Sequence, residues 1–173
     1  MKKILCVLLA AAMLLAAVSC SGGDETTKPF DSLINGFLKN ETAAYLSAFD
    51  GEYVTAATEV YKQLGRNLKS ELKDSITASL DNLEYTNGAK LKISYKIINK
   101  TGMTQAEIGQ PYLDLHVISY DLPLDKITEA YKTTLSVKIK GKTNTEELEI
   151  EIKTLKINGK WVLHPEMFMF MFA

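Results

Sequence analysis

The stretch YKTTLSVKIKGKTNTEELEIEI, residues 131–152, decides the fold, because apolar and polar side chains alternate along both of its arms. One face of the first arm carries Tyr131, Thr133, Leu135, Val137 and Ile139, and the other carries Lys132, Lys138 and Lys140. In the second arm, Leu148, Ile150 and Ile152 alternate with Glu147, Glu149 and Glu151. A period of two is typical of half-buried strands, and opposed lysines and glutamates favour pairing on a wet face. The stretch therefore predicts an antiparallel hairpin that turns over residues 141–145.

The segment that follows the hairpin changes parity. Leu155 and Ile157 fall on the opposite parity from Ile152, so we expect a bulge near Lys153 and Thr154 that returns them to the buried face. Asn-Gly at 158–159 is a strong signal for a two-residue hairpin turn. Residues 160–163 then form the last strand, which completes a three-stranded meander.

The residues before the hairpin predict helices first and then one more strand. Apolar stripes at helical spacing cover residues 30–38, 45–49 and about 53–84, where one or two helices are expected with Gly65 as the break. After a turn at 87–88, residues 91–97 alternate as a strand, and Thr104 and Glu107 are spaced as a capping box for a short helix. The fold class is therefore α+β, with N-terminal helices packed on a curved antiparallel sheet.

The N-terminal residues predict a segment that is removed. Lys2 and Lys3 precede an apolar run over residues 4–18, which ends in small residues before Cys20. This order is that of a secretory signal peptide over residues 1–19, too short and wrongly flanked for a spanning helix. Residues 20–29 predict a flexible tether, and residues 30–173 a single domain. The alternative is an ordinary signal peptide in which the cysteine stands by chance.

Composition excludes some partners. The chain of 173 residues has 20 basic and 21 acidic residues; without Lys2 and Lys3, 18 basic residues face 21 acidic ones, for a net charge near −3. A chain with this slightly negative net charge is not expected to bind the phosphate backbone of DNA or RNA, so we expect no nucleic-acid partner. Of two cysteines, Cys6 leaves with the signal and Cys20 remains alone, so no disulfide is expected.

Three resemblances follow from these motifs. Residues 17–20, AVSC, resemble the lipobox of bacterial lipoproteins, which implies cleavage before Cys20 and attachment of diacylglycerol, with acyl chains such as palmitate, to that residue. The order of helices and strands resembles the cystatin-like α+β cone of the superfamily of nuclear transport factor two, ketosteroid isomerase and scytalone dehydratase. ITEAY at 127–131 and LKINGKWVL at 155–163 resemble the ends of small Gram-positive lipoproteins of unknown function.

Catalytic chemistry finds no support in the sequence. Inward positions of the expected strands hold no Asp, Glu or His, and their polar groups are those of Tyr95, Tyr131 and Thr133. A general base must reach the substrate, so we predict no catalytic residue, and no ligand spacing predicts a metal or cofactor. Tyr95, Tyr131 and Trp161 are candidates to line a ligand pocket or are simply core. His116 is expected to be packed, and His164 to face solvent.

The C-terminal run Met167–Phe172 is apolar without interruption. It predicts a segment packed into the domain or, alternatively, a Met-rich contact surface. Taken together, the sequence predicts an exported protein that is lipid-anchored at the outer face of a cell membrane. Its expected role is non-catalytic, binding a small apolar ligand or an envelope protein. The alternatives are an isomerase- or dehydratase-like enzyme and a structural accessory domain of the cell envelope.

Overall fold

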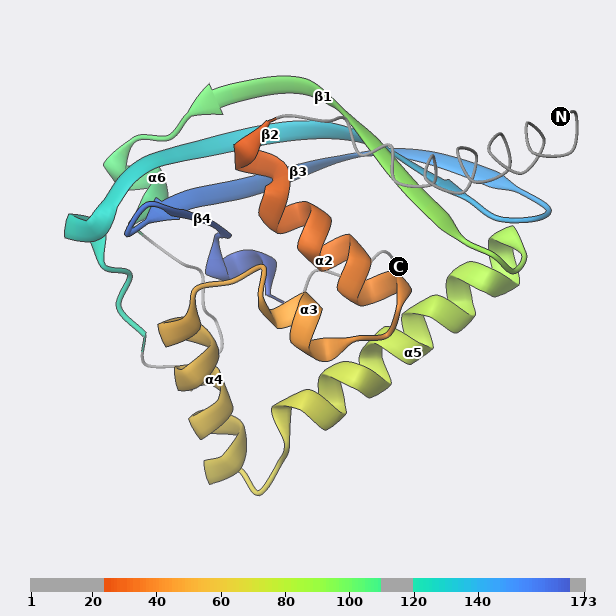
Figure 1. Ribbon diagram of the computed structural model, residues 1–173, viewed down its shortest axis with the longest axis horizontal. Coiled ribbons are helices and arrows are strands. Elements are labelled where there is room, and N and C mark those ends of the chain that lie inside the picture. The colour runs from red at the N-terminus through yellow and green to blue at the C-terminus, as the bar shows by residue number, and fades with distance from the viewer. Residues whose placement is uncertain (1–23, 110–119, 169–173) are drawn as a thin grey trace, which may run out of the picture.

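The computed structural model describes residues 24–109 and 120–168, which form an α+β domain (Figure 1). The helices are η1 (Glu25–Thr27), α2 (Lys28–Leu38), α3 (Thr42–Leu46), α4 (Gly51–Gln63), α5 (Leu68–Asn87), α6 (Gln105–Ile108), η2 (Leu124–Lys126) and η3 (Pro165–Met167). The strands are β1 (Lys92–Gly102), β2 (Ile127–Lys140), β3 (Thr145–Ile157) and β4 (Lys160–Leu163). No helix among the described residues is long and apolar enough to cross a membrane.

The strands form one antiparallel sheet in the order β1-β2-β3-β4, which curves over α2 and α3 (Figure 1). The predicted hairpin is confirmed, with Leu135 opposite Ile150 and Lys138 opposite Glu147. Asn158 and Gly159 both have positive φ, at 50° and 79°, as a two-residue hairpin turn requires. Strand β1 is longer than expected, because it continues past a bulge at Ile98 to Gly102.

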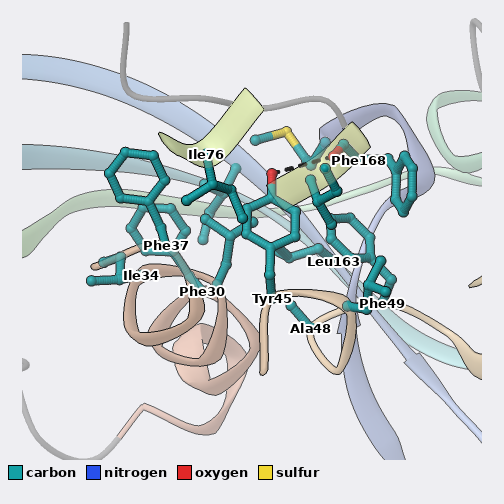
Figure 2. Close-up of a cluster of buried hydrophobic side chains, with 14 of the residues drawn as sticks. Phe30, Ile34, Phe37, Tyr45, Ala48, Phe49, Ile76, Leu163 and Phe168 are labelled. Carbon is teal, nitrogen blue, oxygen red and sulfur yellow. Dashed lines mark hydrogen bonds between the residues drawn. The ribbon is translucent and has the colours of Figure 1, made fainter. Parts of the chain in front are cut away.

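The helices pack their predicted stripes on the inner face of the sheet. Phe30 and Phe37 of α2 are fully buried, and Gly65, at φ 71°, separates α4 from α5, so the region expected to hold one or two helices holds two. Met167 and Phe168 are also buried, and Figure 2 shows Phe168 beside Phe49, with the Tyr45 hydroxyl donating to the Phe168 carbonyl at 3.2 Å. The start of the apolar C-terminal run therefore belongs to the core, while residues 169–173 lie outside the described residues.

The parity change in β3 has a different cause from the one expected. No bulge occurs at Lys153 and Thr154, since the pairing with β2 runs in register from Ile152 to Leu155. Leu155 points to the outer face instead, where it is fully buried in a second apolar cluster. That cluster consists of Ile108, Ala130, Leu155, Ile157 and Val162. The predicted bulge is wrong because α6 covers this end of the outer face, so apolar side chains are buried on that face as well.

The folded domain begins earlier than the expected tether allows. Asp24 caps η1 by accepting a hydrogen bond from the Thr26 amide at 3.0 Å, and Thr26 and Thr27 are buried. Residues 24–29, expected in the tether, are therefore part of the domain. Cys20 and the expected signal peptide lie outside the described residues.

The end of the sheet at the β2–β3 turn is held to the C-terminal end of α5 by hydrogen bonds. The carbonyl of Asn87, the last residue of α5, accepts hydrogen bonds from the amides of Thr143 and Asn144 at 2.9 and 3.1 Å, and from the Thr143 hydroxyl at 2.8 Å. A Cβ at Gly141 would stand 2.2 Å from that carbonyl oxygen, so only glycine fits. The turn between β2 and β3 is thus held by backbone groups of a helix rather than by a core.

Candidate functional site

The clefts on the described part of the surface include three of about 270–360 Å³. One of about 310 Å³ lies between α6 and the beginning of β2, and one of about 360 Å³ lies between α5 and the beginning of β1. The third, of about 270 Å³, lies between the N-terminal turn and β4, and we call it the Trp161 cleft. Its lining residues are Glu25, Lys28, Pro29, Ser32, Ser47, Gly159, Lys160 and Trp161.

The structure brings two of the three predicted pocket residues together. The rings of Tyr131 and Trp161 lie 5.8 Å apart, because Tyr131 pairs with Thr154 and Trp161 with Lys156, which places both rings on the same face of the sheet. The ammonium of Lys100 lies 4.5 Å from the Tyr131 ring centroid, and that of Lys156 lies 5.5 Å from the Trp161 ring. Cations over aromatic faces are mutually stabilising. The result is an aromatic rim with two lysines on it.

Each of these lysines also has a carboxylate partner. Lys100 pairs with Asp24 at 2.9 Å and Lys156 with Glu129 at 2.6 Å. Partial burial by itself raises the pKa of Asp24, but hydrogen bonds from Lys100 and Thr26 outweigh it and hold that pKa below its usual value. The hydrogen bond to Glu129 raises the pKa of Lys156. The rim is therefore charged but internally neutralised, which argues against a dedicated anion site at these two lysines.

Tyr95 lies elsewhere, in the core. It is 3% exposed, packs edge-on against Phe30 at 5.3 Å, and donates its hydroxyl to Asp31 Oδ1 at 2.6 Å. A carboxylate beside a phenol is the pair an isomerase-like site would use, but neither residue lines any of the three clefts in the described part of the chain. The bond between them therefore fastens α2 to β1.

His164 is buried, so the prediction that it faces solvent is wrong. It is fully enclosed at the end of β4, where its Nδ1 accepts the Glu166 amide at 3.3 Å and its Nε2 lies 3.5 Å from the Ile108 carbonyl oxygen. Burial lowers the pKa of His164 more than the nearby Glu166 carboxylate raises it. The imidazole thus joins β4 to α6 in its neutral form. His116 lies outside the described residues.

Two threonine hydroxyls lie on the inner face of the sheet, and the sequence predicted only that of Thr133 to point inward. Thr133 and Thr154 are fully buried, and their Oγ1 atoms have no hydrogen-bond partner among the described residues. No group of three His, Cys, Asp or Glu side chains in the described ranges is placed to hold a metal ion.

Sequence reasoning missed Lys100 and Asp24. Lys100 pairs with Thr133 and so faces inward, because the bulge at Ile98 reverses the parity that Ile97 sets. The only signal in the sequence was the consecutive pair Ile97-Ile98, in which one of two apolar residues must leave the buried face. The polar neighbours of Asp24 predict a tether, and no local pattern indicates its ion pair with Lys100.

The geometry therefore offers an aromatic rim beside a shallow cleft at the end of the sheet nearest the N-terminal turn. Comparison of the chain with models of known protein families, with curated proteins and with solved structures found no match.

Proposed function

We propose that this protein is an exported lipoprotein, anchored by diacylglycerol on Cys20 to the outer face of a cell membrane, whose α+β domain is a non-catalytic interaction module. One observation carries the proposal. The chain begins with a positively charged segment, continues with an apolar run, and then reaches Cys20. A folded domain begins only four residues after Cys20, at Asp24. Two or three acyl chains at one residue are enough for durable attachment, whereas a single chain is not.

The shape of the domain supports a cystatin-like cone. Helices α2 to α5 precede the sheet, and α6 separates β1 from the meander β2–β4, which is the order expected for that class. The inner positions of the sheet are filled by Leu135, Val137, Ile139 and Ile152, all packed in one cluster with the helices. The described clefts of about 270, 310 and 360 Å³ lie at the low end of the volumes of ligand pockets, and the space between the sheet and the helices is filled by these core side chains. A protein or another envelope component is therefore favoured over a small apolar ligand as the partner.

Labelling with a radioactive or clickable fatty acid tests the anchor. The full chain is expressed in bacterial cells, and the label on the protein is compared between the Cys20→Ser and Cys6→Ser variants. Cys6 is the matched control, because it is the other cysteine and lies inside the expected signal. We expect Cys20→Ser to lose the label and to leave the membrane fraction, and Cys6→Ser to keep both. Label on the Cys20→Ser variant would refute the proposal.

Native mass spectrometry of the purified protein tests the kind of partner. We expect a mass equal to that of the denatured chain, which would direct the search to protein partners. A retained small molecule would instead show that the domain is a ligand carrier.

A further inference from the structure

We propose that the end of the domain around Trp161 is a membrane-contact surface that rests on the anionic phospholipid headgroups of the membrane holding the anchor. The surface consists of Lys28, Lys126, the turn Asn158-Gly159, Lys160 and Trp161, and we call it the tether-side surface. The inference rests on the proposed anchoring at Cys20.

The first argument is the short reach of the chain. From Cys20 to Asp24 there are four residue steps, which span at most about 14 Å when fully extended. Asp24 is held in the domain by its ion pair with Lys100 and by its cap of η1. An anchor at Cys20 therefore keeps the surface next to Asp24 within that distance of the acyl chains, and the headgroup layer itself occupies roughly 5–7 Å of it.

The second argument is which residues lie beside Asp24. Glu25 and Lys28 line the same cleft as Gly159, Lys160 and Trp161, so the β3–β4 turn stands next to the start of the folded chain. The Asn158 amide donates to the Lys126 carbonyl at 3.4 Å, which brings η2 to the same turn. Residues far apart in sequence thus gather where the tether begins.

The third argument is the chemistry of these residues. Trp161 is half-buried, and tryptophan and tyrosine prefer the level of the headgroups in membrane proteins. Lys126 and Lys160 are exposed and have no ion-pair partner among the described residues, in contrast to Lys100, Lys156 and Lys28, the last of which pairs with Glu25 at 2.8 Å. Lysines close to the surface of an anionic leaflet are attracted to its negative potential. An aromatic anchor and two lysines without a carboxylate partner in the described part of the chain fit anionic headgroups.

The opposite end of the sheet then points away from the membrane. Strand β3 runs from Thr145, beside the turn that holds Lys142, past Lys156, which pairs with Trp161, and the eleven residue steps between Thr145 and Lys156 span about 36 Å. A protein partner in the envelope would meet that end first.

Tryptophan quenching tests the orientation, because Trp161 is the only tryptophan in the chain. The full chain is expressed, and its acylated product is reconstituted in vesicles of phosphatidylglycerol and phosphatidylcholine. The vesicles contain a lipid that carries a nitroxide high on its acyl chain. The matched reporter is Trp161→Phe combined with Lys142→Trp, which moves the tryptophan to the exposed far turn. We expect several-fold stronger quenching of Trp161 than of the far reporter. Equal quenching, or none at either position, would overturn the inference.

Two controls separate the parts of the proposal. The variant Lys126→Glu with Lys160→Glu is expected to lower the quenching of Trp161 several-fold, and no change would refute the assignment to anionic headgroups. The intact mass first reports whether Cys20 is acylated. If it is not, the proposed function fails, and the orientation is still tested by coupling Cys20 of the Cys6→Ser chain to a maleimide lipid in the same vesicles.

Discussion

The two ends of the one sheet are built differently. At the hairpin end, around residues 136–150, the outer face is wet and carries charged pairs such as Lys138 and Glu147. At the β4 end, the outer face is covered by α6, and Leu155 is fully buried there although its parity is that of Glu147 and Glu149. In Figure 1 the first end lies beside the C-terminal end of α5 and the second beside α6. An alternating pattern identifies a buried face only where the other face is wet.

The largest expected effect comes from truncating the outer face at the β4 end. We expect Leu155→Ala to lower the free energy of unfolding by about 2–5 kcal/mol, because it opens a cavity in a fully packed site. The matched change is Leu148→Ala on the same strand, where the side chain is 36% exposed and the loss should be under about 1 kcal/mol. Urea unfolding followed by circular dichroism measures both, and equal losses would contradict the comparison.

The second effect tests how the hairpin end is held. Gly141→Ala would press a methyl group against the Asn87 carbonyl, and we expect a loss of about 1–3 kcal/mol in the free energy of unfolding. Gly102→Ala is the control, since a Cβ there meets nothing within 4 Å. If both variants unfold at the same urea concentration, the contact between α5 and the turn does not stabilise the domain.

The third effect is a pH dependence confined to the β4 end. Burial lowers the pKa of His164 below its ordinary 6.5, so the unfolded chain binds a proton more readily than the folded one. The stability present above pH 6.5 is therefore lost as the pH falls below that value. We expect His164→Gln to flatten the dependence of the urea midpoint on pH between neutral and mildly acidic conditions. A wild-type slope in this variant would show that another group is responsible.

The smallest effect is expected on the wet face of the hairpin. Glu147 Oε1 lies 2.5 Å from Lys138 Nζ, and the hydrogen bond between them lowers the pKa of Glu147. Both side chains are about half exposed. Exposed pairs of this kind contribute little and are screened by salt. Glu147→Gln should shift the urea midpoint only slightly at low salt and not at all at high salt. A large shift that persists in high salt would mean that this face is covered.

Particular residues show how far the sequence could be used. The alternation at 131–139, the stripe of α2, the capping box at Thr104 and the Asn158-Gly159 turn all predicted the local structure that is observed, because each depends on neighbours a few residues away. Of the candidate pocket residues, Tyr131 and Trp161 came together, whereas Tyr95 proved to be a core residue bonded to Asp31. Lys100 was missed, because a bulge, which propensity does not predict, reversed its parity.

By itself the sequence determined the α+β class, the order of the elements and the place of the main core, since the periods of two and 3.6 are properties of the strand and the helix. The tertiary structure alone decided that Leu155 is buried on the outer face, that His164 is enclosed, and that Asp24 belongs to the domain. Each of these depends on a contact with an element far away in the chain: α6 for the first two and β1 for the third. A local pattern records which side chains avoid water, but not which distant segment excludes it.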